Sequence, residues 1–248
     1  MNMLRDEANV LIGDISCLFG SLSLEDRLAW LQGAGHSIVF TTSLGIEDQV
    51  VTDALVSALP SARIVTLDTL RLFDETVDLI EETEARYGIS IERFLPEPSA
   101  VDQFVATYGM NGFYESVEAR HACCGIRKVE PLGRALAGAD IWITGLRRGQ
   151  SAARGSVPFA EWDADRELLK INPLADMTLE DIRIRVAERS IPVNPLHLRG
   201  YPSIGCAPCT RAIKPGEDER AGRWWWERDE QRECGLHVAG AASALPAA

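Results

Sequence analysis

Residues 37–59, SIVFTTSLGIEDQVVTDALVSAL, contain the pattern that decides the fold. The first part, 37–42, is apolar and β-branched, which is typical of a buried strand. After a short SLG turn, residues 46–59 have the composition of a helix, and Pro60 ends it. A buried strand that leads through a tight turn into a helix is typical of a sheet with parallel strands, so a parallel sheet is the first expectation.

The same alternation of strand and helix continues along the chain. Further strands are predicted at 62–67, 89–95 and 140–145, with an edge strand at 167–172, and helices are predicted within 1–35 (one capped by Ser23) and over 71–87, 122–136 and 178–190. This pattern predicts an α/β fold, with a mostly parallel twisted sheet and helices on both faces. We expect a single domain over 1–227 and a flexible C-terminal tail over 228–248. In such a sheet, ligands bind at the carboxyl ends of the strands.

Composition narrows the class of protein. Of the 248 residues, 46% are hydrophobic and 25% are charged, which is typical of a globular chain. No apolar run approaches the roughly 20 residues of a membrane helix, and the N-terminus lacks the basic start and apolar core of a secretory signal. We therefore expect a cytoplasmic protein with no membrane partner; a homo-oligomer stays possible. The net charge of −12 argues against nucleic acid as a partner.

Four of the six cysteines form two close pairs, which points to metal or redox chemistry. Cys123 and Cys124 are adjacent at the start of a predicted helix, and Cys206 and Cys209 form a CxxC. Four thiolates can hold zinc or an iron–sulfur cluster. Adjacent helical residues project about 100° apart, which suits the separate irons of a cluster better than one zinc ion. A redox disulfide in the CxxC and simple burial of the adjacent pair remain alternatives.

The other two cysteines have no partner at metal-ligand spacing. Cys17 lies in an apolar helical stretch and is expected in the core. Cys234, in the ECGLH motif of the tail, is a candidate nucleophile, and His237 could help to ionise or orient it. An incidental free thiol is the alternative reading of Cys234.

Positive charge is concentrated in one part of this acidic chain. Residues 120–155 contain seven cations and two anions, and Arg220 and Arg223 add a pair three residues apart. This clustering favours a small anionic substrate, although a solvated helix face would also explain it. The SLG turn before a helix could offer backbone N–H groups to a phosphate. Three adjacent tryptophans, 224–226, cannot all face the core, so at least one of them is expected at the active site or at a partner, although ordinary burial near the cysteine pairs would explain them equally well.

Five ordered motifs resemble those of the assimilatory adenosine 5′-phosphosulfate (APS) reductases, which are related to the phosphoadenylylsulfate (PAPS) reductases. The motifs are CCGIRKVEPL (123–132), ITGLRRGQS (143–151), LHLRGYPSIGCAPCTR (196–211), ERAGRWWWE (219–227) and ECGLH (233–237). The resemblance implies an adenine nucleotide α-hydrolase-like fold and an oxidoreductase of sulfate assimilation and cysteine biosynthesis. It implies reduction of APS to sulfite and AMP through an S-sulfocysteine on Cys234, with thioredoxin or glutaredoxin as reductant.

The resemblance also assigns roles to individual residues. Cys123, Cys124, Cys206 and Cys209 would be the metal ligands of a [4Fe–4S] cluster, and SLGIED would be a modified pyrophosphatase loop. The substrate-binding residues would be Ser43, Gly45, Asp68, Thr69, Lys128, Gly145, Arg147, Arg154, Arg220 and Arg223.

The sequence departs from the family pattern in two places. Leu70 follows Thr69 where the family usually has glycine, and the stretch between Gln150 and Arg154 is one residue shorter than in some members. No thioredoxin-like extension follows, so the reductant is expected to be another protein. Alternative readings are a PAPS reductase, a tRNA-thiolating iron–sulfur enzyme, which should carry an SGGxDS-type loop and a basic face, and a non-catalytic nucleotide sensor.

Overall fold

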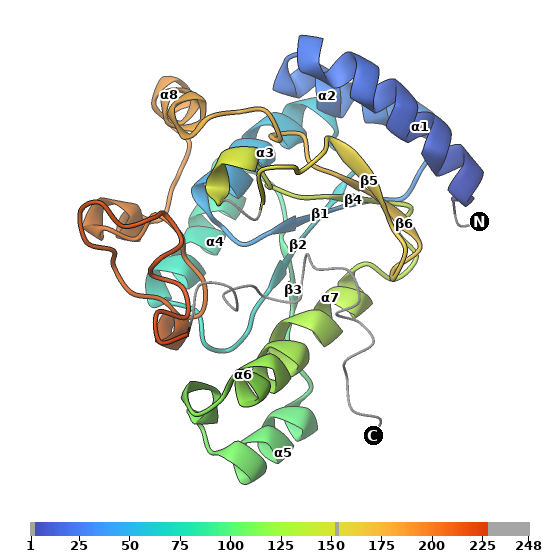
Figure 1. Ribbon diagram of the computed structural model, residues 1–248. Helices are drawn as coiled ribbons and strands as arrows, with labels where there is room; N and C mark the ends of the chain where they lie inside the picture. Colours follow the sequence, from blue (N-terminus) through green and yellow to red (C-terminus); the bar gives the residue numbers. More distant parts are fainter. Residues whose placement is uncertain (1–2, 152–153, 228–248) are drawn as a thin grey trace.

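Six strands form one sheet in the part of the chain that the structure describes, residues 3–151 and 154–227 of a computed structural model (Figure 1). The strands are β1 (Ile38–Thr42), β2 (Arg63–Leu67), β3 (Glu92–Phe94), β4 (Ile141–Ile143), β5 (Ala160–Asp163) and β6 (Leu168–Ile171). Their order is β3-β2-β1-β4-β6-β5, and all neighbours are parallel except β5, which pairs antiparallel with β6. The predicted, mostly parallel sheet is confirmed.

Helices cover both faces of this sheet, as predicted (Figure 1). They are α1 (Arg5–Leu18), α2 (Leu24–Trp30), α3 (Ile46–Ala58), α4 (Asp74–Tyr87), α5 (Pro98–Tyr108), α6 (Val117–Cys124), α7 (Glu130–Ala135) and α8 (Leu179–Arg189). Helices α1–α4 and α8 contribute to the larger core on one face, and α7 packs on the other face beside α5 and α6. Among the described residues, no helix combines the length and hydropathy needed to cross a bilayer.

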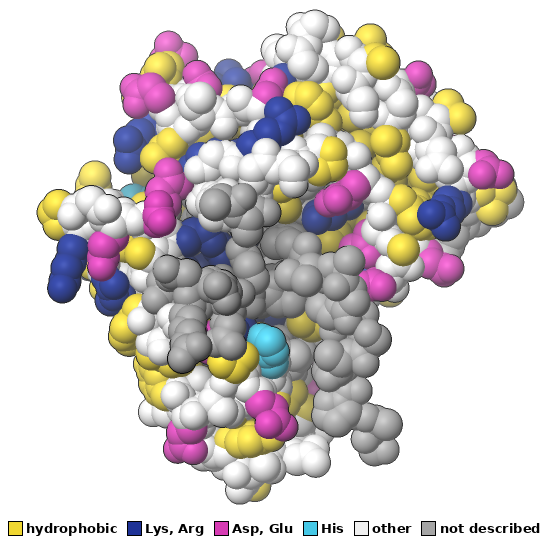
Figure 2. Space-filling model, viewed as in Figure 1, with side chains coloured by type: hydrophobic (Ala, Val, Ile, Leu, Met, Phe, Trp, Pro, Cys, Tyr) yellow, Lys and Arg dark blue, Asp and Glu magenta, His cyan; other side chains and the backbone are white. Residues whose placement is uncertain are grey.

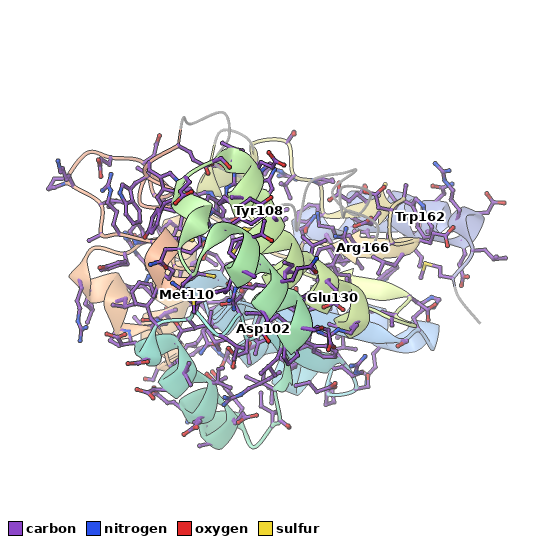
Figure 3. All side chains as sticks on the ribbon, turned by 90° about the horizontal axis from the view of Figure 1, so that it is seen from below. Asp102, Tyr108, Met110, Glu130, Trp162 and Arg166 are labelled. Carbon is purple, nitrogen blue, oxygen red and sulfur yellow. The ribbon has the colours of Figure 1, made fainter. Side chains whose placement is uncertain are left out.

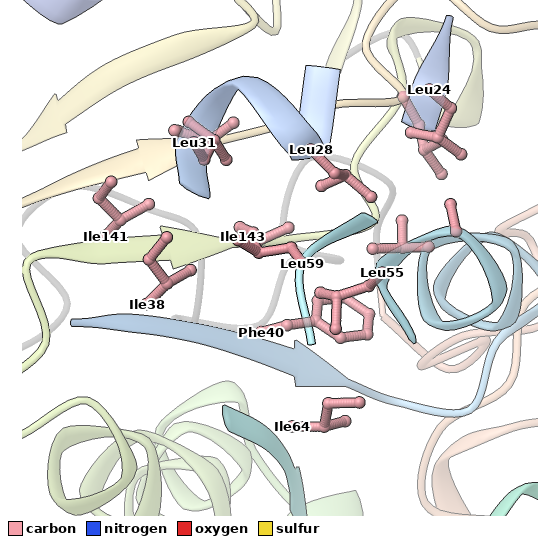
Figure 4. Packing of buried hydrophobic residues seen from close by; sticks show 14 of the residues in the cluster. Leu24, Leu28, Leu31, Ile38, Phe40, Leu55, Leu59, Ile64, Ile141 and Ile143 are labelled. Carbon is pink, nitrogen blue, oxygen red and sulfur yellow. The ribbon is translucent and has the colours of Figure 1, made fainter. Parts of the chain in front are cut away.

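The two cores follow from the alternation of side chains along the strands. Phe40 of β1 and Ile143 of β4 are fully buried in the larger core, where they pack with Leu55 of α3 (Figure 4). Val39 points to the opposite face, where the smaller core also contains Trp142. Burying large apolar side chains on both faces stabilises the sheet by roughly 1.5–3 kcal/mol per side chain.

The strand order creates a switch point between β1 and β4. From β1 the chain continues to β2 and β3 on one side, whereas β4, β6 and β5 extend the sheet on the other side. The loops that leave β1 and β4 at their carboxyl ends therefore turn away from each other, and a crevice forms between them.

Helix ends obey the predicted capping chemistry. The side chain of Ser23 accepts the Asp26 N–H, and Thr178 forms a reciprocal capping box with Asp181. Both contacts satisfy backbone donors that a helix leaves free at its N-terminus.

Several elements differ from the sequence prediction. Helix α5 and strand β5 were not predicted, and residues 167–172 contain an inner strand, β6, because β5 covers its far side. The predicted helix 122–136 begins earlier, at Val117, and contains a π-helical turn over Gly125–Val129. Figure 3 shows α5, with Asp102 and Tyr108 along it, as the outermost helix on its side.

Cys17 does not lie in the core, so that prediction was wrong. Its helix, α1, packs on the sheet through Ala8 and Ile15, and the face that carries Cys17 points to solvent. The apolar character of the stretch did not specify which face is buried.

The predicted tail, 228–248, lies outside the described residues. On the face seen in Figure 2, acidic and basic side chains are interspersed over the described surface.

Arg27 of α2 joins the N-terminal helices to the segment after β6. Its guanidinium donates to both carboxylate oxygens of Asp176, at 2.7 and 2.8 Å, and to the carbonyl oxygens of Phe19 and Pro173, each at 2.7 Å. The Arg27 side chain is buried, and so are Phe19 and Pro173, so the two carbonyl oxygens have little access to water, whereas the Asp176 side chain is 31% exposed.

We predict that Arg27→Leu lowers the free energy of unfolding by about 2–4 kcal/mol, because it leaves the buried carbonyl oxygens of Phe19 and Pro173 unpaired. Urea denaturation measures the change. The control is Arg63→Leu, which breaks a more exposed pair with Glu92 and should cost less than about 1 kcal/mol. Equal losses in the two variants would contradict the anchoring role of Arg27.

Candidate functional site

A cavity of about 210 Å³ opens at the carboxyl ends of β1, β2 and β4. Thr42, Thr66 and Thr144 line it, each within one residue of the end of a strand. Thr66 donates to the Thr42 carbonyl at 2.8 Å, and Thr144 donates to Asn172 at 2.6 Å. The cavity thus lies at the switch point, where the topology predicts a ligand.

The loop between β1 and α3 forms one wall of this cavity. Leu44 in the loop is buried in the left-handed region, at φ +58°, and its N–H donates to Thr42 Oγ1. Strain of this kind in a non-glycine residue often marks a functional loop. Gly45 caps α3, and no side chain caps the free N–H groups of the helix's first turn. This wall therefore presents backbone N–H groups to the cavity, and anion binding at the loop stays a prediction.

Asp48, in the first turn of α3, binds back to the loop between β1 and α3. Its Oδ2 accepts both the N–H and the hydroxyl of Ser43, at 2.6 and 2.7 Å. Its Oδ1 lies only 2.1 Å from the point where a Cβ at Gly145 would be, so no larger residue fits at 145. Asp48 therefore touches the loop after β1 and the loop after β4.

Burial raises the pKa of Asp48 to about 6, because the charged form is desolvated. The hydrogen bonds from Ser43 and the charge of Arg154 lower this pKa, whereas Glu47 raises it further. A carboxyl with such a pKa in a cavity is a candidate for function.

The turn after β2 connects the cavity to the cysteines. Asp68 accepts the Leu70 N–H at 3.0 Å, and Leu70 has a left-handed φ of +58° with 55% of its surface exposed. The Thr69 carbonyl accepts from Arg127 at 2.7 Å, and Thr69 Oγ1 accepts from the Cys206 thiol at 3.3 Å. Leu70 thus has the left-handed backbone conformation that glycine adopts most readily.

The four paired cysteines come together in a second, smaller cavity of about 20 Å³. Cys123 and Cys124 reach it from the end of α6, and Cys206 and Cys209 from the loop after α8. Two cysteine pairs that are distant in the sequence therefore line one pocket. None of the described cysteines forms a disulfide, so the CxxC is not a disulfide in this structure.

The described thiols are not arranged as a preformed metal site. Within residues 3–151 and 154–227, no group of three or more potential ligands is arranged around a single metal position. Burial raises the pKa of Cys209 to about 12 and also raises the pKa of Cys123. The nearby cations Lys128, Arg127 and Arg223 oppose these shifts.

Three residues line both cavities and thus join them: Lys128, Cys206 and Trp224. Trp224 is fully buried with a left-handed φ of +44°, and its ring lies 4.7 Å from the Arg223 guanidinium and 6.0 Å from Lys128 Nζ. Its indole Nε1 is buried without a hydrogen-bond partner among the described residues. The wall that the two cavities share therefore places the positive charge of Lys128 and the indole N–H of Trp224 near the thiols.

Most of the predicted substrate-binding residues line the larger cavity: Ser43, Gly45, Thr69, Lys128, Gly145, Arg154, Arg220 and Arg223. Asp68 and Arg147 do not line it. Asp68 stabilises the turn, and Arg147 is buried between Glu47 and Glu219, at 2.8 and 2.7 Å. Cys234 and His237 lie outside the described residues.

Sequence reasoning missed Asp48, Gln150, His197 and Gly205, which also line the cavity. Gly205 admits no side chain, because a Cβ there would lie 2.1 Å from Arg223 Nη2. The ring of His197 contacts the Tyr201 carbonyl through Nδ1, and its Nε2 is buried without a partner. Burial lowers the pKa of His197. The only sequence signal for Asp48, Gln150, His197 and Gly205 was that each lies within one of the motifs quoted in the sequence analysis.

Comparison with known proteins gives one matching family model. Residues 37–212 match the phosphoadenosine phosphosulfate reductase domain. The adenosine 5′-phosphosulfate reductase of Agrobacterium fabrum is 61% identical over 99% of this chain and 95% of its own length. That of Allochromatium vinosum is 55% identical over 86% of this chain and 83% of its own length.

Solved structures show the same fold. The phosphoadenylyl-sulfate reductase of Candida auris, solved as a phosphate complex, superposes with a TM-score of 0.72, covering 86% of this chain and 99% of its own, at 23% identity. The FMN adenylyltransferase of Candida glabrata superposes with a TM-score of 0.54, covering 99% of this chain and 81% of its own, at 17% identity.

We predict that Leu70→Gly raises the free energy of unfolding by about 0.5–1 kcal/mol, because glycine adopts the left-handed conformation without a steric cost. Part of this gain is offset by the greater freedom of glycine in the unfolded chain. Thermal or urea unfolding measures it. Leu70→Ala keeps the Cβ and should leave stability nearly unchanged. A loss of stability in Leu70→Gly would show that the exposed leucine side chain makes a stabilising contact.

Proposed function

This chain belongs to the phosphoadenosine phosphosulfate reductase domain family, and from that membership we propose that it reduces adenosine 5′-phosphosulfate to sulfite and AMP. The relatives that support this substrate are those named adenosine 5′-phosphosulfate reductase. Sulfate assimilation in the cytoplasm would be its setting, with thioredoxin or glutaredoxin as reductant.

The observation that carries the proposal is the joined pair of cavities. One is lined by strand ends and by cations, and it shares Lys128, Cys206 and Trp224 with the pocket of four cysteines. A nucleotide with an anionic phosphosulfate is a ligand that this combination suits.

Arginine and lysine side chains would bind the phosphosulfate. Arg154, Arg220, Arg223 and Lys128 line one cavity, and Arg223 is held by the Ile204 carbonyl at 3.1 Å and by its stacking on Trp224. Cations fixed before the substrate arrives stabilise the charge that develops on the leaving phosphate. They also reduce the repulsion between an attacking thiolate and the sulfate.

Cys234, outside the described residues, would be the nucleophile. Its thiolate would form a bond to the sulfate sulfur while the S–O bond to the phosphate breaks, so that AMP leaves with the electron pair. A thiolate of the reductant would then attack Cys234 Sγ and release sulfite. The second thiol of the reductant would complete a disulfide, so the dithiol supplies the two electrons.

Cys123, Cys124, Cys206 and Cys209 would hold an iron–sulfur cluster. All four line one pocket, and two of them are adjacent on a helix, which suits the separate irons of a cluster better than one zinc ion. The unpartnered Trp224 Nε1 is a donor that sulfur atoms in this pocket could satisfy. When bound, such a cluster would supply local charge and would fix the position of Lys128.

We predict that Cys234→Ser binds APS but releases no AMP in a single turnover, because a serine hydroxyl is a far weaker nucleophile than a thiolate. Quenched-flow chromatography of AMP gives the readout. Mass spectrometry of the unchanged chain with APS, without reductant, should show one added SO₃ on Cys234. Normal AMP release from the variant, or an adduct on another cysteine, would reject the assignment.

We predict that Cys206→Ser lowers the iron content from about four per chain and removes the broad visible absorption of the protein purified without oxygen. Cys17→Ser is the matched control, because Cys17 is exposed and remote from the pocket. It should leave iron and colour unchanged. A colourless unchanged protein that contains zinc would contradict the cluster.

A further inference from the structure

Asp48 is a buried acid that the proposed reaction does not use. It lines the cavity, and the loop after β1 and the loop after β4 both contact its carboxylate. Ser43 donates two hydrogen bonds to the carboxylate, and both go to one oxygen, Oδ2. The other oxygen, Oδ1, faces Gly145 at a distance that leaves no room for a side chain.

The charged groups around Asp48 come from three segments. Glu47 precedes it on α3, and its negative charge opposes ionisation of Asp48. Arg154, from the segment after β4, favours ionisation, while Arg147 is occupied by Glu47 and Glu219. His197, which also lines the cavity, has a pKa lowered by burial and contributes little positive charge near neutral pH. Arg154 is therefore the cation that supports the charged form of Asp48, and its effect is smaller than those of burial and of the hydrogen bonds from Ser43.

We propose that Asp48 couples substrate binding to proton uptake: when the anionic nucleotide enters the cavity, the Asp48 carboxylate takes one proton from solvent. This inference rests on the proposed function, because it assumes that a phosphosulfate nucleotide enters this cavity. Asp48 is thus a positioning residue that is bonded to the loop after β1, lies against the loop after β4 and adjusts its charge to the ligand.

The physical reason is electrostatic linkage. A bound phosphosulfate near Arg154 weakens the attraction between that guanidinium and the Asp48 carboxylate. The negative charge of the ligand also repels the carboxylate. Both effects favour the neutral carboxyl, so its pKa rises above the value of about 6 in the free protein. Protonation forms one O–H bond on Asp48 and removes one proton from the buffer, and nothing is oxidised or reduced.

The sign of the pH dependence follows. Below pH about 6 Asp48 is already neutral, so affinity for the nucleotide should change little there. Above that pH, binding must bring a proton with it, and affinity should fall by up to about tenfold per pH unit until the pKa of the bound state is passed.

The test is calorimetry of APS binding to Cys234→Ser, in buffers of different ionisation enthalpy between pH 6 and 8. The phosphosulfate of APS is fully ionised in this range, so the ligand itself takes up no proton. We expect uptake of up to about one proton per nucleotide in Cys234→Ser and none in Cys234→Ser/Asp48→Asn. Asparagine keeps the shape and an acceptor for Ser43 but cannot ionise.

The matched control is Cys234→Ser/Asp53→Asn. Asp53 is a buried carboxylate of the same helix that does not line the cavity, so the proton count should equal that of Cys234→Ser. Equal proton uptake with and without Asp48 overturns the inference and leaves the proposed function intact. Failure of APS to bind Cys234→Ser overturns both.

A second measurement does not need the Asp48 variant to fold. Infrared difference spectra of Cys234→Ser, with aspartate labelled by ¹³C, should gain the C=O band of a protonated carboxyl when APS binds at pH 7. Absence of that band in the bound state overturns the proposal. A purely structural role for Asp48 would move neither the band nor the proton count.

Discussion

Compensation of buried charge at the carboxyl edge of the sheet is the constraint on which the site depends. A guanidinium out of water is tolerated only when carboxylates or carbonyl oxygens surround it. Arg147, 1% exposed, lies between Glu47 and Glu219, and Arg120 forms a buried two-point pair with Glu227. Each pair joins segments that are far apart in the sequence. The same contacts that neutralise the charges therefore also shape the cavities.

The site is also a place of backbone strain. Leu44, Leu70 and Trp224 have left-handed conformations, and they lie in the loop after β1, in the turn after β2 and in the wall shared by the two cavities. Side chains with fixed partners hold these conformations, such as Thr42 for Leu44 and Asp68 for Leu70. Strain held in this way keeps the loops in one arrangement before a ligand arrives. Lys128, Cys206 and Trp224 line both cavities, so the thiol pocket and the larger cavity share one wall.

Local patterns predicted the parts of the fold that local physics governs. The apolar stretches of β1, β2 and β4, the caps at Ser23 and Thr178, and the helix after the SLG turn were all recognisable, because burial and capping depend on near neighbours in the chain. Strand β5 was missed because its residues are only half apolar, and its place at the sheet edge depends on pairing with β6. Cys17 was misplaced because only packing decides which face of α1 is buried.

For the site, the sequence by itself determined the chemical inventory: two cysteine pairs, a concentration of arginines and a phosphate-type loop, all visible as motifs. Only the tertiary structure decided how these groups are used. It brought the cysteine pairs into one pocket, turned Asp48 back onto Ser43 and assigned Arg147 to two carboxylates instead of the cavity. The reason is physical: charge and burial act through space, and a residue's role depends on which distant segments surround it.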